Sequence, residues 1–168
     1  RPLSILGTEN MSIAAEVYVG YKTWLEASPY TGKEDCQLKI GSGTRVGNFN
    51  HIYAMESIVI GKNVLTADKV YISDNLHSYE DITTPISLQP IKQIGVVEIG
   101  DGAWLGENVC VIGCRVGKNS VIGANSVVTK SIPDYCVAVG SPAKVIKRFN
   151  LDKNKWIKTN DKGVFIEG

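Results

Sequence analysis

One histidine in this chain combines a side chain suited to proton transfer with a position in a long polar segment. His77 lies in "YISDNLHSYEDITTP", residues 71–85, and it is one of only 2 histidines. A neutral imidazole, with a pKa of about 6.5, can accept the proton of a hydroxyl as that hydroxyl forms a new bond. Its other ring nitrogen then needs an acceptor, for which Glu80, Asp81 and a backbone carbonyl are candidates. The alternative is a solvated loop histidine, and the surrounding pattern decides between the two.

The second histidine and the cysteines indicate packing and not a metal site. His51 lies in the regular stretch "NFNHIY", where we expect a packed or solvated side chain, with the lining of a substrate pocket as the alternative. The 4 cysteines form no C-x-x-C pair and, with so few histidines, do not support a zinc site. We expect no metal, and we expect reduced structural thiols, as in a cytoplasmic protein, at Cys36, Cys110, Cys114 and Cys136.

Length and charge limit the classes of partner. The 168 residues suit one domain with its own core. The formal net charge is +1, so the chain lacks the strong positive charge typical of nucleic-acid-binding proteins. No apolar run approaches the ~18 residues of a membrane span. We therefore expect neither nucleic acid nor a membrane span among its interactions.

The elements that must position His77 follow from a repeat of six residues. Apolar residues recur at this interval in five triplets, with one threonine among them: Ile13, Val19, Leu25; Ile40, Val46, Ile52; Ile60, Thr66, Ile72; Ile99, Leu105, Val111; and Val116, Ile122, Val128. In the last four triplets, glycine follows 7 of the 12 positions, where about one is expected by chance. The pattern is therefore a true repeat.

A period of six favours a β-solenoid. An α-helix would spread these residues around its surface, because 3.6 does not divide six. Short extended segments joined by tight turns fit better, and three of them make one triangular coil of about 18 residues whose apolar side chains stack on the next coil. The largest interruption lies between Ile72 and Ile99 and contains His77, and a smaller one separates Leu25 from Ile40. Long loops on a regular scaffold are usually functional.

Three motifs together resemble the hexapeptide-repeat acyltransferases, over residues 10–148. They are the repeats "IGDGAWLGENV" and "VGKNSVIGANSVVTKSIP", the closing stretch "VAVGSPAKVIKRF", and the histidine loop after "IGKNVLTADKVYIS". The chain is most similar to the branch that acetylates galactosides, maltose and polysaccharides. The resemblance implies an all-β, left-handed parallel β-helix over residues 1–148, with a long catalytic loop at 74–96 and a short C-terminal tail at 149–168.

The same resemblance implies how the protein works. Members of this family are homotrimers in which each active site lies between two neighbouring prisms, and the acyl donor is usually acetyl-CoA. His77 matches the general base. Asn48 matches a position near the acceptor. Glu56 and Asp74, which are 18 residues apart, are candidate acceptors of hydrogen bonds from sugar hydroxyls, or else part of an acidic outer face.

The resemblance also assigns the donor side. Trp104 matches a position along CoA, Ala124 and Ser126 match the coils along the pantetheine arm, and Thr129 and Lys130 match positions near the nucleotide. Lys144 and Lys147 stand where the family often has arginine. Lysine can meet a phosphate as a point charge but lacks the bidentate fork, and Arg148 is a candidate to compensate.

We therefore expect an acetyl-CoA-dependent O-acetyltransferase that acts on a hydroxyl of a saccharide or saccharide-lipid precursor. An N-acetyltransferase for an amino sugar, or an acetyltransferase for an antibiotic or other xenobiotic, would share the histidine loop. A purely structural β-helix is the non-enzyme alternative, and it would not need that loop. Carbonic anhydrase of the β-helical type needs three histidine ligands, so two exclude it. Residues 26–37 and 74–96 are the expected acceptor loops, but loop sequence does not identify the acceptor.

Overall fold

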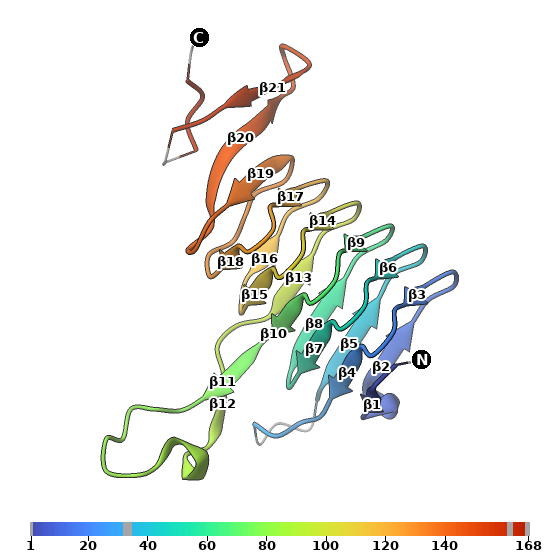
Figure 1. The fold of residues 1–168 in the computed structure, drawn as a ribbon, viewed down its shortest axis with the longest axis vertical. Coiled ribbons are helices and arrows are strands. Elements are labelled where there is room, and N and C mark those ends of the chain that lie inside the picture. Colours follow the sequence, from blue (N-terminus) through green and yellow to red (C-terminus); the bar gives the residue numbers. More distant parts are fainter. Residues whose placement is uncertain (1, 32–34, 161–162, 167–168) are drawn as a thin grey trace.

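Three parallel sheets wind into a triangular prism in a computed structural model that describes residues 2–31, 35–160 and 163–166 (Figure 1). Sheet A contains β1 (Ser4–Leu6), β4 (Trp24–Ala27), β7 (His51–Ala54), β10 (Tyr71–Ser73), β15 (Cys110–Ile112) and β18 (Val127–Val128). Sheet B contains β2 (Met11–Ile13), β5 (Gln37–Ile40), β8 (Ser57–Ile60), β13 (Val97–Ile99) and β16 (Arg115–Val116). The chain passes from sheet B to C to A in every coil, so each coil contributes one strand to each face.

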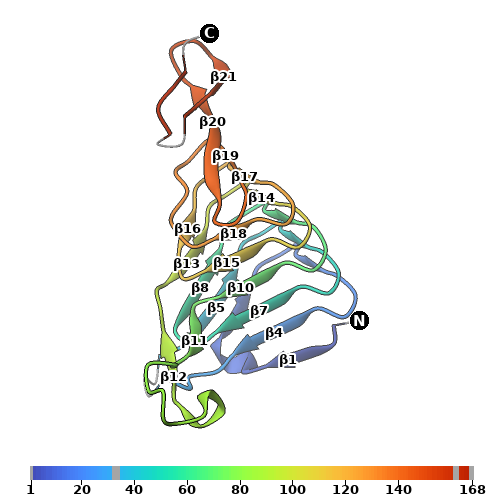
Figure 2. The ribbon, with the colours of Figure 1, turned by 60° about the vertical axis from the view of Figure 1, so that its left-hand side comes forward.

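Sheet C carries the third face and continues into the tail. It contains β3 (Tyr18–Val19), β6 (Arg45–Val46), β9 (Leu65–Thr66), β14 (Trp104–Leu105), β17 (Val121–Ile122), β19 (Cys136–Val139), β20 (Lys144–Asn150) and β21 (Lys155–Lys158). The last two strands run antiparallel and form a hairpin that extends beyond the end of the prism (Figure 2). The expected boundary between residues 148 and 149 falls inside β20, so the tail begins within a strand that pairs with the last strand of the solenoid, β19.

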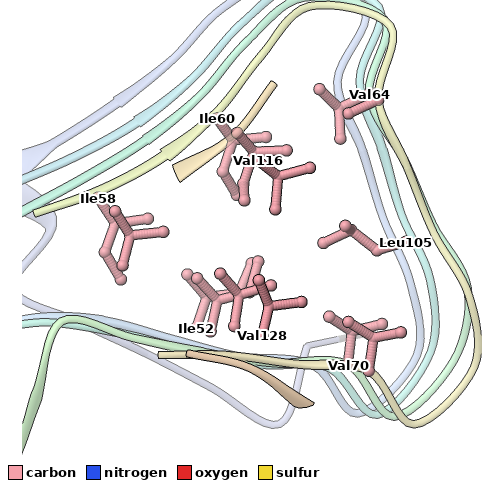
Figure 3. Close-up of a cluster of buried hydrophobic side chains, with 14 of the residues drawn as sticks. Ile52, Ile58, Ile60, Val64, Val70, Leu105, Val116 and Val128 are labelled. Carbon is pink, nitrogen blue, oxygen red and sulfur yellow. The ribbon is translucent and has the colours of Figure 1, made fainter. Parts of the chain in front are cut away.

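The six-residue repeat forms the core in the predicted register. Leu25, Ile52, Ile72, Val111 and Val128 pair in successive strands of sheet A, and the first and second members of each triplet pair in the same way in sheets B and C. Figure 3 shows two of these rows inside the triangle, one from Ile52 to Val128 and one from Ile60 to Val116. An all-β, left-handed parallel β-helix is confirmed.

Turn residues close the corners between sheets. Gly100 is needed because a Cβ there would lie 2.5 Å from the backbone nitrogen of Lys118 in the next coil. Asparagines at Asn63, Asn119 and Asn125 take positive φ angles of 52°, 48° and 60°, which asparagine tolerates better than most residues. The spacing of glycine and asparagine in the sequence thus sets the corners, and the corners set the three faces.

The long interruption leaves the prism at the corner between sheets A and B. Its two arms, β11 (Asn75–His77) and β12 (Ile91–Gln93), pair antiparallel, and a short 3-10 helix, η2 (Ile86–Leu88), lies near its tip. In Figure 1 this loop extends away from the coils. A second 3-10 helix, η1 (Thr8–Asn10), lies near the first coil. Within the described residues, no helix is long and apolar enough to cross a membrane.

Candidate active site

His77 lies at the end of β11, where the loop leaves the prism. Its backbone pairs with Ile91 across the two-stranded ladder, and its side chain is exposed. The strand continues from β10, which is fixed on both sides by β7 and β15. A rigid coil therefore holds the base of the arm, while the imidazole stands outside the stacked core.

Neither carboxylate near His77 in the sequence contacts it. Glu80 forms an ion pair with Lys92 and accepts a hydrogen bond from the Tyr79 backbone N–H, and the Lys92 contact lowers the pKa of Glu80 to about 2. Asp81 accepts hydrogen bonds from Thr83 Oγ1 at 2.6 Å and Thr84 Oγ1 at 2.7 Å, which lower its pKa to about 2. Both carboxylates stabilise the loop itself, so no described side chain of this loop orients the imidazole.

Asp74 is a structural residue at the base of the same loop. It is fully buried, and its carboxylate accepts hydrogen bonds from the backbone N–H groups of Met55, Glu56 and Ser57 at 2.8–3.1 Å and from Asn75 Nδ2 at 2.8 Å. Glu56 contacts Asp74 through its backbone N–H. Asp74 therefore anchors the corner beneath His77, and its buried oxygens are occupied by protein donors.

Asn48 belongs to a different corner, between sheets C and A. Its Oδ1 accepts the Tyr21 backbone N–H at 2.8 Å, and its Nδ2 lies 3.2 Å from both carboxylate oxygens of Asp68. These contacts tie three successive coils together. Within one chain, the structure places Asn48 at one edge of the prism and His77 at another.

His51 packs on the outer face of sheet A and not in the loop. Its ring stacks on Trp24 with centroids 4.8 Å apart, and its Nε2 is buried without a hydrogen-bond partner among the described residues. Burial lowers the pKa of His51, and the nearby carboxylate of Glu26 partly opposes that shift. The packed alternative for His51 agrees with these contacts.

Two donor-side residues lie on one outward row of sheet C. Trp104 pairs with Val121, Val121 with Val137, and Val137 with Lys147, while the alternate residues of β14, β17 and β19 face the core. Trp104 is 48% exposed. Because neighbouring strands are ~4.8 Å apart, the three steps from Trp104 to Lys147 cover roughly 15 Å. The row is an apolar track that begins at an exposed indole and ends at a cation.

Three other donor-side residues line a cleft of about 480 Å³ at the C-terminal end of the prism. They are Thr129, Lys130 and Lys144, and the cleft also includes Arg148. Arg148 Nη1 donates to the Gly163 carbonyl at 3.2 Å, and its guanidinium lies 5.6 Å from the Phe165 ring centroid. The structure thus brings three predicted residues and Arg148 together in a positively charged cleft.

Ala124 and Ser126 separate in the structure. Ala124 is exposed at the corner between sheets C and A. Ser126 is fully buried, and its Oγ accepts the Gly140 backbone N–H at 3.0 Å. Ser126 lies at the corner, two residues before the inward-facing Val128, and its side chain also points into the prism. The Ser126 hydroxyl is therefore used in a structural hydrogen bond, and the assignment of Ser126 to the coils along the pantetheine arm stays a prediction.

His77 and the apolar track lie on opposite sides of one chain. His77 leaves at the corner between sheets A and B, whereas Trp104 and Lys147 lie on the outer face of sheet C, the face opposite that corner. Figure 3 shows Ile58 beside that corner and Leu105 of sheet C across the core. A ligand on the track therefore cannot reach the imidazole of the same chain without crossing the prism.

In the described part of the chain, the cysteines and acidic residues are not grouped as metal ligands. All four thiols are free, and burial raises the pKa of Cys36 to about 11 and raises those of Cys114 and Cys136. Among the described residues, no group of three histidine, cysteine, aspartate or glutamate side chains is arranged to hold a metal ion. The cysteines pack in or against the coils.

Comparison with known proteins agrees with this architecture. The family model described as the hexapeptide repeat of succinyl-transferase matches residues 96–130. A solved structure of galactoside acetyltransferase in complex with coenzyme A superposes with a TM-score of 0.68 at 24% identity, covering 96% of this chain and 75% of that chain. At this identity the superposition shows a shared fold.

Sequence relatives extend the likeness. The galactoside O-acetyltransferase of Escherichia coli is 33% identical over 83% of this chain and 68% of its own length. The corresponding enzyme of Lactococcus lactis is 32% identical over 89% of this chain and 70% of its own length. An E. coli protein named for O-acetyl transfer in lipopolysaccharide biosynthesis is 40% identical over 68% of this chain. The chain spans 45% to 62% of that protein and of relatives from Mycobacterium tuberculosis and Saccharomyces cerevisiae. By its coils, its corners and these relatives, the chain belongs to the hexapeptide-repeat acyltransferase family.

Proposed function

We propose that the protein transfers the acetyl group of acetyl-CoA to a hydroxyl of a saccharide, with His77 as the general base. The observation that carries the proposal is the exposed imidazole of His77 on an arm that leaves an otherwise regular solenoid. A structural solenoid has no need of such an arm. The named activities of the E. coli and L. lactis relatives, which are galactoside O-acetyltransferases, support the reaction class.

Acetyl transfer from a thioester to a hydroxyl requires that the protein position the two substrates and supply one proton acceptor. The acceptor oxygen attacks the thioester carbonyl carbon while His77 takes the hydroxyl proton, and a carbon–oxygen bond forms. The carbon–sulfur bond then breaks, and the imidazolium returns the proton to the departing sulfur. A positioned general base contributes typically 10²- to 10⁴-fold to such a step. The products are the acetyl ester and the free thiol of CoA.

The outer row of sheet C and the end cleft are suited to the donor. The apolar side chains of Val121 and Val137 fit a pantetheine arm, and Trp104 provides a large exposed surface at one end. Lysines and Arg148 at the other end fit phosphate groups, which lysine binds as a point charge. The outward row alone thus places an apolar stretch before a cation, Lys147, which is the order of the pantetheine arm and the phosphates in acetyl-CoA.

We also propose that each site forms between two copies of the chain in a homotrimer. The opposite placement of His77 and Trp104 supports this assembly, because one chain cannot bring both to one substrate. The loop also exposes apolar side chains without cover in the single chain, with Ile82 96% and Leu88 74% exposed. Exposed apolar side chains in one region mark contact surfaces.

An acceptor screen tests the proposed reaction. Acetyl-CoA is incubated with galactosides, maltose, oligosaccharides and amino sugars, and free thiol release is measured against an enzyme-only blank. Alkaline hydroxylamine then separates the products, because it cleaves an acetyl ester and leaves an acetamide. Ester formation on a saccharide supports the proposal. Acetamide formation would assign N-acetylation instead, and no thiol release with any acceptor would contradict the saccharide class.

A further inference from the structure

The lysine that ends the outward row of sheet C is paired with a second lysine from the tail. Lys147 on β20 lies directly opposite Lys158 on β21 in the hairpin register. Directly opposed residues of an antiparallel pair project from the same face with Cβ atoms about 5 Å apart. The two ammonium groups therefore share one side of the hairpin, which is the side that continues the row from Trp104.

The pair has no carboxylate to balance it within the described part of the chain. The ion pairs found there are Lys69–Glu107, Lys92–Glu80 and Arg115–Asp134, all outside the hairpin. Both lysines are exposed. Like charges placed directly opposite destabilise a strand pair, so this arrangement is unfavourable unless an anion lies between the two ammonium groups.

The charge of the whole segment agrees with an anionic ligand. Residues 144–168 contain 7 lysines and arginines and 3 acidic residues, a net charge of +4. Residues 1–143 contain 11 lysines and arginines and 14 acidic residues, a net charge of −3. The sum is the +1 of the full chain. The positive charge is thus concentrated in the last strands, where the hairpin extends beyond the prism (Figure 2).

We infer that Lys158 acts with Lys147 as a two-lysine clamp for the 3′-phosphate of the acyl donor. The inference rests on the proposed use of acetyl-CoA. That phosphate is a dianionic monoester at the end of CoA far from the thioester, just as the lysine pair is at the end of the row far from Trp104. Two lysines supply two separate point charges where one arginine would supply a fork.

Calorimetric titration with CoA and with dephospho-CoA, which lacks only the 3′-phosphate, tests the clamp. Lys158→Ala is expected to raise the dissociation constant for CoA roughly 3- to 10-fold, the effect of one charged contact near the surface. It should leave the dissociation constant for dephospho-CoA unchanged. Lys158→Arg should restore most of the affinity for CoA.

Lys155→Ala is the matched control. Lys155 lies on the same strand and carries the same charge, but it pairs with Asn150 on the opposite face of the hairpin. Lys155→Ala should leave both dissociation constants unchanged.

A second readout needs no ligand. Lys158→Ala should raise the melting temperature of the free protein slightly, because it removes the repulsion from Lys147. If Lys158 were merely structural, its removal would lower the melting temperature.

The outcomes separate the clamp from the proposed function. If the parent binds neither CoA nor acetyl-CoA, the proposed function fails. If the parent binds CoA and Lys158→Ala binds it equally well, the clamp is overturned and the function stands. A matching loss for CoA and dephospho-CoA would place Lys158 at the diphosphate and overturn the 3′-phosphate assignment.

Discussion

The Asp74 carboxylate accepts a hydrogen bond from the backbone N–H of Glu56 at 2.8 Å, within a set of three consecutive amides that it caps. Asp74 is the last residue before the arm that carries His77, and Glu56 lies at the corner between β7 and β8 in the previous coil, so this contact joins the arm to that corner. The carboxylate is fully buried and also accepts from Asn75. The arm is thus anchored by hydrogen bonds from backbone N–H groups to a buried carboxylate.

Removing that anchor is expected to destabilise the fold. Asp74→Ala leaves the backbone N–H groups of buried Met55 and half-buried Glu56 and Ser57 without this acceptor, which should cost about 3–5 kcal/mol of unfolding free energy. Urea unfolding measures the loss. The control is Asp101→Ala, since Asp101 accepts a single backbone N–H, from Lys62, at an exposed corner and should cost about 1 kcal/mol. Equal and small losses for the two variants would contradict the structural role of Asp74.

His51 should make stability depend on pH in the acidic range. Burial lowers its pKa in the folded protein below the unfolded value of about 6.5, so the unfolded state binds the proton more readily. The contribution of His51 is therefore fully present above that value and is lost as pH falls toward the folded pKa. Urea midpoints measured between pH 7 and pH 5 should fall less steeply for His51→Gln than for the parent.

The thiols should differ in reactivity. Burial raises the pKa of Cys36 to about 11 and also raises those of Cys114 and Cys136, and the thiolate is the reactive form. Cys110 is the only cysteine of the chain that is not buried. With a thiol reagent at neutral pH, we expect one faster phase that Cys110→Ser removes, and four reactive thiols after denaturation. Rapid reaction of all four in the native protein would contradict this packing.

Complementation between subunits tests the assembly. His77→Ala lacks the proposed base, and Val121→Glu places a carboxylate on the proposed donor row, so each homo-oligomer should be inactive. In a cyclic trimer that contains both variants, one of three sites pairs an intact His77 with an intact row. Co-expressed and doubly purified mixed oligomers should therefore show about one third of the parent turnover. Mixed oligomers without activity would place the base and the donor on the same chain.

Much of this structure was predictable from sequence, because each apolar residue of the six-residue repeat occupies one defined inward position. The triplet Ile99, Leu105 and Val111 illustrates this, with one residue on each face. Polar residues were harder to place. Asp74 and Ser126 bond to backbone groups of neighbouring coils, and spacing does not reveal whether a polar side chain turns inward at a corner. The pairing of Lys147 with Lys158 required the hairpin register.

The central claim is tested most directly by the turnover of His77→Ala with acetyl-CoA and the best acceptor from the screen. The variant should bind CoA like the parent, unfold at the same temperature within about 2 °C, and lose about 10²- to 10⁴-fold in kcat. Tyr79→Ala, in the same loop, is the control for loop disruption and should retain most activity. The pH profile of the parent should show an apparent pKa in the histidine range that is absent from His77→Ala. Parent-like turnover and an unchanged pH profile for His77→Ala would contradict the assignment of His77 as the general base.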